Sequence, residues 1–303
     1  MLQVHHIVKK FNIRKKSQSK LKDFFRPQYS DFYALKDVSF EVKQGEKVAF
    51  IWPNGAGKST TIKAILGILH YDAGEIKVFD KDPKQQRKEI SKLTSSVFGQ
   101  RSQLLYHLPL MDSFNFFKII YEIPDEMFQQ RLERFVEKFW VSEFLYQPVR
   151  KLSLGQRMKG EIIASLLHAP KAIFLDEPTV WLDIVAKKVL YEILNEIHKK
   201  EQITIFLTSH DLNDIEKLCD RAIVINRGTL LYDGQLTDLM QEYANKKFIR
   251  YKEADSLDWE TIEIENQPAL LQKAVKHLLE TKNIEDITIE NLPLEEVIEE
   301  FYK

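Results

Sequence analysis

Residues 47–69 read KVAFIWPNGAGKSTTIKAILGIL, and they carry the strongest signal for the fold in this sequence. KVAFI is a short apolar strand, WPNGAGKS is a glycine-containing loop, and the residues from about Lys58 follow a helical pattern. The loop nearly fulfils the pattern G-x-x-x-x-G-K-[ST], in which backbone N–H groups and the positive end of a helix surround a phosphate. The stretch therefore predicts an α/β fold with a phosphate-binding loop.

Each residue of this loop has a defined part in that chemistry. The backbones of Gly55 and Gly57 approach the phosphates, Lys58 neutralises the β- and γ-phosphates, and Ser59 ligates Mg²⁺. The residues expected to contact the nucleotide here are Pro53, Asn54, Gly55, Ala56, Gly57, Lys58, Ser59 and Thr60.

A second apolar strand ends in acidic residues at KAIFLDEP, residues 171–178. Asp176 at its carboxyl end is the expected Mg²⁺ ligand. Glu177 follows it and can orient and deprotonate an attacking water, which is the role that phosphoryl transfer requires of a base. An isolated LDE is more often the start of a helix, so this interpretation depends on the loop at Lys58.

The rest of the chain alternates strands with helices, which predicts a largely parallel sheet. A Phe-rich helical subdomain is expected at about residues 105–160, inside a main domain at 1–240. The remaining residues, 241–303, are expected to form a small β/α accessory domain. Its predicted elements are strands at 246–251, 260–265 and 285–289, a helix at Pro268–Thr281 and a closing helix at 293–302.

The composition limits the classes of function. The 303 residues are 44% hydrophobic with a formal net charge of -1, so the chain has no global basic field that would attract nucleic acid. One cysteine, Cys219, excludes an intramolecular disulfide, and its expected place is the core. No apolar run reaches the roughly 20 residues of a membrane helix. A cytoplasmic setting is expected.

A basic stretch runs from Lys9 to Arg26, where eight lysines and arginines accompany one acidic residue, Asp23. It is either a solvated loop or a patch for anionic lipid headgroups or a membrane partner.

KLSLGQRMK, residues 151–159, resembles the LSGGQ-type signature of ABC ATPases, and it precedes the Asp176 strand as in that family. By the same resemblance, Gln100 matches the Q-loop glutamine, Leu182 and Asp183 the D-loop, and His210 in LTSHD the switch histidine. The motifs follow the family's order over roughly residues 1–235.

The resemblance implies an ATPase that uses ATP and Mg²⁺. Glu177, His210 and Lys58 are then the catalytic residues, and Ser59, Gln100 and Asp176 the metal ligands. Two ATP molecules are sandwiched between two head-to-tail subunits, with Ser153, Gly155 and Gln156 of one subunit facing the γ-phosphate held by the other, beside Asp183. Phe11 is the expected aromatic on the adenine, and Tyr33 is the alternative; a core role for either ring is the other interpretation.

Further similarity, in FGQRSQLLYHLP and IEDITIENLPLEEVIEEFY, is to ATPase subunits of ABC-2 type exporters of the daunorubicin and multidrug efflux group. It implies a separate ABC-2 type permease, a second ATPase subunit and a peripheral place at the cytoplasmic face of the membrane. A soluble ABC ATPase of repair or translation is the alternative. Such proteins carry coiled-coil inserts, zinc motifs or tandem units, which this sequence lacks.

Trp52 and Trp181 stand where the family has glycine in the P-loop and the D-loop, and Trp140 and Trp259 fall at expected turns. Indole side chains suit such positions poorly. Glycine is also scarce, at 10 residues. The hypothesis is that UGA codons read as glycine have been written as tryptophan. The alternative is a degenerate nucleotide-binding regulator.

Overall fold

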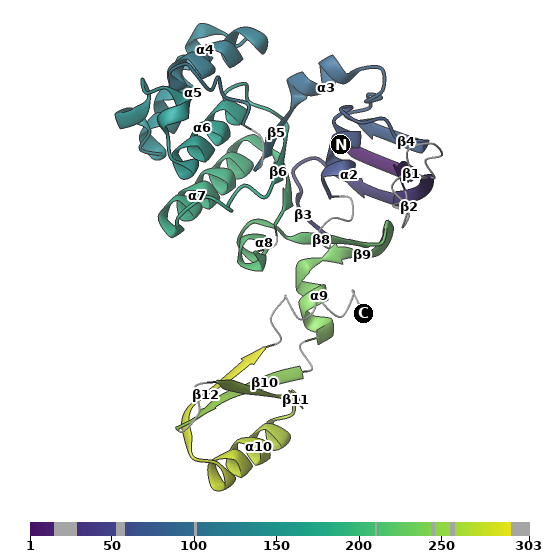
Figure 1. Ribbon diagram of the computed structural model, residues 1–303, viewed down its shortest axis with the longest axis vertical. Coiled ribbons are helices and arrows are strands. Elements are labelled where there is room, and N and C mark those ends of the chain that lie inside the picture. The colour runs from purple at the N-terminus through teal and green to yellow at the C-terminus, as the bar shows by residue number, and fades with distance from the viewer. Residues whose placement is uncertain are drawn as a thin grey trace, which may run out of the picture. The chain divides into compact units, whose positions relative to one another are not determined.

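The computed structural model describes residues 1–14, 29–52, 58–99, 102–209, 211–243, 246–254 and 258–291. The chain divides into two compact units, Met1–Asp233 and Gly234–Lys303. The division falls seven residues before the expected boundary at 240, and each unit is described by itself (Figure 1).

A six-stranded sheet organises the first unit, in the order β5-β6-β7-β3-β8-β9. The strands are β3 (Lys47–Ile51), β5 (Thr94–Phe98), β6 (Ala172–Asp176), β7 (Thr204–Thr208), β8 (Arg221–Asn226) and β9 (Thr229–Gln235). The pairs β5–β6, β6–β7, β7–β3 and β3–β8 are parallel. Their nearly continuous apolar sequences suit strands covered on both faces. The predicted parallel sheet is confirmed, and it brings the carboxyl ends of β3, β6 and β7 to one edge.

An antiparallel sheet in the order β2-β1-β4 accompanies it. Its strands are β1 (Leu2–Arg14), β2 (Tyr29–Val42) and β4 (Ala73–Val78). One hydrophobic core joins the two sheets, where Phe40 from β2 packs 5.7 Å from Phe50 and 6.5 Å from Phe206 between ring centroids. The helices of this region are α2 (Lys58–Ile65), α3 (Arg87–Leu93), α7 (Ile184–Glu201) and α8 (Leu212–Leu218).

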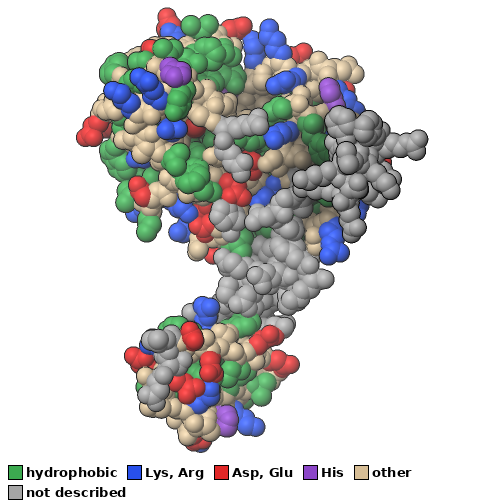
Figure 2. All heavy atoms as spheres, in the orientation of Figure 1, with side chains coloured by type: hydrophobic (Ala, Val, Ile, Leu, Met, Phe, Trp, Pro, Cys, Tyr) green, Lys and Arg blue, Asp and Glu red, His purple; other side chains and the backbone are tan. Residues whose placement is uncertain are grey.

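The helical part of this unit contains α4 (Leu110–Ile120), α5 (Asp125–Lys138) and α6 (Leu154–Leu166), with short 3₁₀ turns at Ser142–Phe144 and Val149–Lys151. The helices gather beside the β5–β6 edge of the sheet (Figure 1). Their apolar faces meet over buried Phe114, Phe135 and Phe139. Hydrophobic side chains also reach the surface of α4 (Figure 2), where Ile119 is 75% and Ile120 50% exposed.

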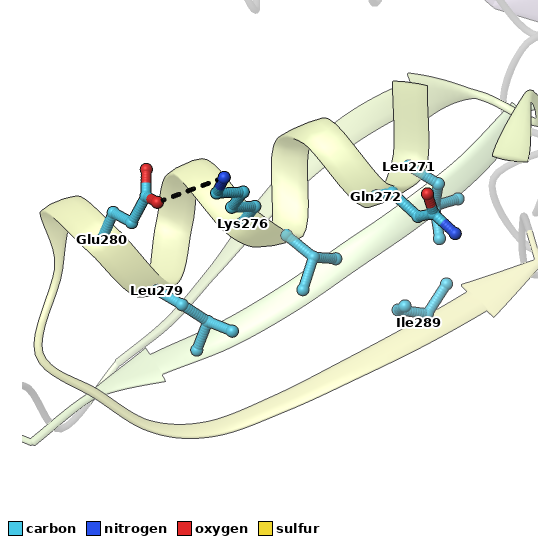
Figure 3. A pocket seen from close by; sticks show the side chains of 7 residues that line it. Leu271, Gln272, Lys276, Leu279, Glu280 and Ile289 are labelled. Carbon is cyan, nitrogen blue, oxygen red and sulfur yellow. Dashed lines mark ion pairs between the residues drawn. The ribbon is translucent and has the colours of Figure 1, made fainter. Parts of the chain in front are cut away.

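The second unit carries α9 (Leu236–Tyr243) and an antiparallel sheet in the order β11-β10-β12. The strands are β10 (Lys246–Glu253), β11 (Trp259–Glu265) and β12 (Ile284–Asn291), and α10 (Pro268–Thr281) has the bounds that the sequence predicts. Ile249, Tyr251 and Leu278 form its core. A groove of about 440 Å³ lies beside α10. Leu271, Leu279 and Ile289 are among the side chains that line it (Figure 3). The expected helix at 293–302 lies outside the described residues.

No helix among the residues described above is long and apolar enough to cross a membrane.

Candidate functional site

Three oxygen-bearing side chains meet at the carboxyl edge of the parallel sheet. Asp176 ends β6, and its Oδ2 accepts a hydrogen bond of 2.9 Å from the Ser59 hydroxyl at the start of α2. Its Oδ1 accepts one of 2.6 Å from the hydroxyl of Thr208, which is opposite Asp176 in the β6–β7 register. Two of the three residues expected as metal ligands therefore touch, and Thr208 fixes the carboxylate from its other side. Sequence reasoning did not find Thr208.

The two predicted catalytic residues of opposite charge also meet. Lys58 Nζ lies 3.0 Å from Glu177 Oε1, and both side chains are largely buried. Glu177 adopts a φ of 56°, a left-handed conformation that costs a non-glycine residue on the order of 1–3 kcal/mol. Its N–H donates to the Thr208 carbonyl at 3.0 Å, which holds this backbone in place. The strained turn puts the carboxylate at the start of α2.

Of the other residues predicted at this centre, the structure describes Thr60. Thr60 is on α2, one residue after Ser59. Pro53, Asn54, Gly55, Ala56, Gly57, Gln100 and His210 lie outside the described residues, so their predicted contacts stay predictions.

The signature segment forms the N-terminus of α6 through a capping box. The Ser153 hydroxyl oxygen accepts from the Gln156 N–H at 3.1 Å, and the Gln156 side-chain oxygen accepts from the Ser153 N–H at 2.9 Å. Because the Ser153 oxygen acts as acceptor in the cap, its O–H remains available as a donor toward an anion. A Cβ at Gly155 would lie 3.0 Å from the Trp181 carbonyl oxygen, so glycine permits the close approach of these two segments.

Asp183 is the N-cap of α7, where its carboxylate accepts from the Ala186 N–H at 2.7 Å. The neighbouring Ile184 is 87% exposed. This exposed, apolar helix start is the D-loop position predicted to meet a second subunit.

The aromatic alternatives for adenine both lie on the β1–β2 ladder. Phe11 is opposite Phe32, is 37% exposed and has the Lys9 ammonium 5.2 Å from its ring centroid. Tyr33 is opposite Lys10 and is 42% exposed. Both rings are accessible, and the adenine contact stays a prediction. The described lysines of the basic stretch form ion pairs, Lys9 with Asp72 and Lys10 with Asp31, each at 3.3 Å.

Glu161, a buried residue of the signature helix that sequence reasoning missed, is bonded to the segment after Gln100. Its Oε1 accepts from the Ser102 hydroxyl at 2.6 Å and from the Gln103 N–H at 2.8 Å. Burial raises the pKa of Glu161 above its usual range, although these hydrogen bonds oppose the shift. The contact ties α6 to the end of the predicted Q-loop.

The four tryptophans occupy different environments. Trp140 has a φ of 52° and follows α5, where the N–H groups of Trp140 and Val141 bond back to Glu137 and Val136. This is the αL position of a Schellman motif, which favours glycine. Trp52 is 4% exposed, and its indole Nε1 has no hydrogen-bond partner among the described residues. An unpaired buried donor costs about 1–3 kcal/mol.

One expectation about tryptophan is wrong, and another gains no support from the backbone. Among the tryptophans of the described chain Trp140 alone has a positive φ, so the backbone gives no reason for glycine at 52 and 181. Trp259 is the first residue of β11 and pairs with Lys252, so it lies in a strand and not in a turn. Trp181 is 47% exposed and donates from Nε1 to the Gly99 carbonyl at 3.3 Å.

Comparison with known proteins identifies the family. Residues 35–180 match the family described as ABC transporter. The ABC transporter ATP-binding protein NatA of Bacillus subtilis is 31% identical over 208 residues, which cover 69% of this chain and 84% of that protein. This chain is an ABC transporter ATP-binding protein.

Other relatives of this ABC ATPase are named after different transport systems. The energy-coupling factor transporter ATP-binding protein EcfA2 of Clostridium perfringens is 30% identical and covers 73% of this chain and 78% of its own length. The probable multidrug ABC transporter ATP-binding protein YbhF of Escherichia coli is also 30% identical, over 72% of this chain and 37% of its own length.

Solved structures agree with the fold. A structure titled as the ATP binding subunit of an ABC transporter superposes with a TM-score of 0.68 at 26% identity, over 80% of this chain and 92% of its own. The dimeric cassette MJ0796, bound to ADP and Pi in a post-hydrolysis state, superposes with a TM-score of 0.65 at 22% identity, over 78% and 99%.

The ABC ATPase binds ATP with Mg²⁺ and hydrolyses it, and the residues present fit both. Mg²⁺ takes oxygen ligands and uses few protein groups beside substrate phosphates and water. Ser59 and Asp176 offer a hydroxyl and a carboxylate 2.9 Å apart, next to the Lys58 ammonium. Among the described residues no three His, Cys, Asp or Glu side chains gather as a metal site.

Proposed function

We propose that this chain is the motor subunit of an ABC-2 type exporter, which powers efflux through a separate membrane permease from the cytoplasmic face of the membrane. ABC ATPases dimerise and pair with membrane permeases, and the proposal adds the direction of transport, a homodimer and the residue roles. It rests above all on one observation, the meeting of Ser59, Asp176 and Thr208 next to the Lys58–Glu177 ion pair.

The proposed chemistry uses this arrangement directly. Lys58 turns from Glu177 to the β- and γ-phosphates of ATP, and Glu177 then orients and deprotonates the attacking water. Ser59, Asp176 and Gln100 would hold Mg²⁺, which when bound supplies positive charge for the phosphate oxygens. Thr208 keeps one Asp176 oxygen occupied, so the other, which accepts from the Ser59 hydroxyl, is the one that would hold the metal.

The second subunit completes the site in the proposed homodimer. Ser153 is exposed at the N-terminus of α6, where a hydroxyl and free backbone N–H groups suit a phosphate. Asp183 and Ile184 expose the start of α7 for the same contact. A γ-phosphate held by Lys58 of one copy and by Ser153 of the other makes ATP the link between the copies, and His210 keeps the proposed role of switch histidine.

The direction of transport is supported by sequence similarity. The resemblance to ABC-2 exporter subunits covers the Q-loop region and the C-terminal residues, and one relative carries a multidrug transporter name. Because an energy-coupling factor subunit is equally similar at 30% identity, the permease partner decides between the two classes.

Glu177→Gln tests the catalytic role, since an amide cannot accept the proton of water. We expect the variant to bind ATP, to lose at least about 100-fold in turnover and to accumulate as a dimer with Mg·ATP. Glu192→Gln, in an exposed i,i+4 ion pair on α7, is the matched control and keeps normal turnover. Unchanged turnover in Glu177→Gln would refute the role given to this residue.

The exporter class has its own test. We expect the neighbouring gene to encode a six-span permease that copurifies with the ATPase and changes its rate of hydrolysis. Copurification with an energy-coupling factor membrane component instead would overturn the export assignment.

A further inference from the structure

Asp214, in the first turn of α8, is a fully buried carboxylate that the proposed chemistry does not use. It accepts hydrogen bonds from the hydroxyls of Thr179 and Tyr191. It also accepts one of 3.0 Å from the Ser209 hydroxyl, and the Lys187 ammonium lies 3.5 Å from its Oδ1. A buried charge is tolerated only when it is paired and hydrogen-bonded, and both of its oxygens meet that condition here.

The donors come from three segments that carry the proposed site. Thr179 is two residues after Glu177, and Ser209 directly precedes His210 in the sequence. Lys187 and Tyr191 belong to α7, which begins after its N-cap Asp183. One carboxylate therefore joins the turn after β6, the end of β7 and the helix of the D-loop.

The contacts leave these segments little freedom to move separately. The Ser209 hydroxyl donates to Asp214 and accepts from the Asp211 N–H at 3.0 Å, so its oxygen is held on both sides. Thr179 closes a turn, because its carbonyl accepts from the Leu182 N–H at 3.0 Å. Lys187 also pairs with Asp211 at 2.7 Å, which anchors α7 to the residue after position 210.

We propose that Asp214 is a positioning residue for ATP hydrolysis, which locks the Thr179 turn, Ser209 and α7 into one unit so that the base and the D-loop keep a fixed geometry. The inference rests on the proposed function, since it requires Glu177 to act on water at this edge of the sheet. A positioning role predicts a lower kcat with little change in KM, because ATP is gripped mainly by the loop at Lys58.

The test compares Asp214→Asn with a control on β7, the strand that precedes Ser209. Asp214→Asn replaces one of the two acceptor oxygens by an NH₂ group, which only donates. The remaining amide oxygen cannot accept from Thr179, Tyr191 and Ser209 together. We expect kcat to fall about 10- to 100-fold, with KM for ATP within about twofold. Thr204→Val removes a buried acceptor for the Gly45 N–H at the other end of β7 and is expected to lower the melting temperature with kcat unchanged.

A second variant covers the case in which Asp214→Asn fails to fold. Ser209→Ala keeps the buried carboxylate and removes the bond next to position 210, and we expect the same lower kcat with unchanged KM. Asp214→Glu is expected to recover part of the kcat lost in Asp214→Asn.

Three results would overturn the inference. The first is normal kcat in both Asp214→Asn and Ser209→Ala, and the second is a raised KM at constant kcat. The third is loss of kcat in Thr204→Val to the same extent. If wild type hydrolyses ATP and Glu177→Gln does not, any of these three results rejects the role of Asp214 and leaves the proposed catalytic role of Glu177 standing. Normal turnover in Glu177→Gln rejects the proposed catalytic role, and the inference with it.

Discussion

Acidification is expected to destabilise the first unit through His168. This largely buried ring stacks on Tyr121, with centroids 3.9 Å apart, and lies 3.2 Å from the Thr94 carbonyl through Nε2. Burial lowers the pKa of His168 from 6.5 to about 4, and the Arg131 guanidinium adds to the shift while the Thr94 bond opposes it. The histidine thus joins the end of α6 to α4 and β5 as a neutral group.

The direction of the change in unfolding free energy with pH follows from the number of protons that each state binds. Between pH 6.5 and 4 the unfolded chain protonates His168 and the folded chain does not, so the unfolded state binds more protons. Stability is complete above pH 6.5 and falls as the pH drops toward 4. With about 1.4 kcal/mol for each pKa unit, the full loss of unfolding free energy is about 3 kcal/mol.

Urea unfolding followed by far-UV circular dichroism, from pH 7.5 to 4, measures this loss. His168→Gln does not titrate, so subtracting its pH profile from that of wild type removes the contributions of other groups. We expect the variant to be less stable at pH 7.5, because the Tyr121 stack is lost, and the difference to shrink by about 3 kcal/mol at pH 4. Parallel profiles for the two proteins would refute the assignment.

Three further predictions follow from particular residues. Trp140→Gly is expected to be more stable than Trp140→Ala by about 1 kcal/mol in thermal melts, since φ at 140 is 52° and only glycine accepts it without strain; equal stability would contradict this. Ser153→Ala should cost about 1 kcal/mol of unfolding free energy through the lost cap and also slow hydrolysis, whereas loss of stability with normal kcat would exclude a phosphate contact. Peptide mass spectrometry of the native protein is expected to find glycine at 52, 140 and 181. Tryptophan at 52 and 181 would refute the hypothesis that UGA codons are read as glycine, and it would favour the degenerate regulator.

The glycine hypothesis shows how the structure refines an argument from sequence. A family pattern placed Trp52, Trp140 and Trp181 at glycine positions. The backbone supports this only at Trp140, through its αL cap, and the unpaired indole N–H of Trp52 gives a separate reason to doubt that side chain. Local sequence cannot report a φ angle or an unpaired buried donor, because both depend on what packs around the residue.

Elements whose signals lie within a few residues could be predicted from the sequence alone. The strand before Trp52 and the helix that begins at Lys58, the strand that ends at Asp176 and the helix Pro268–Thr281 follow from periodicity and turn chemistry that neighbouring residues carry. Buried Cys219 likewise follows from composition and local pattern.

Which side chains meet depends on the tertiary structure. Asp176 meets Thr208 because β6 and β7 pair in parallel with these two residues in register, 32 positions apart in the chain. Asp214 accepts from donors on one helix, α7, and on two segments that follow strands, and no spacing in the sequence predicts this arrangement. Such contacts depend on strand order and helix packing, which are settled by the burial of the whole core and not by the preferences of any one segment.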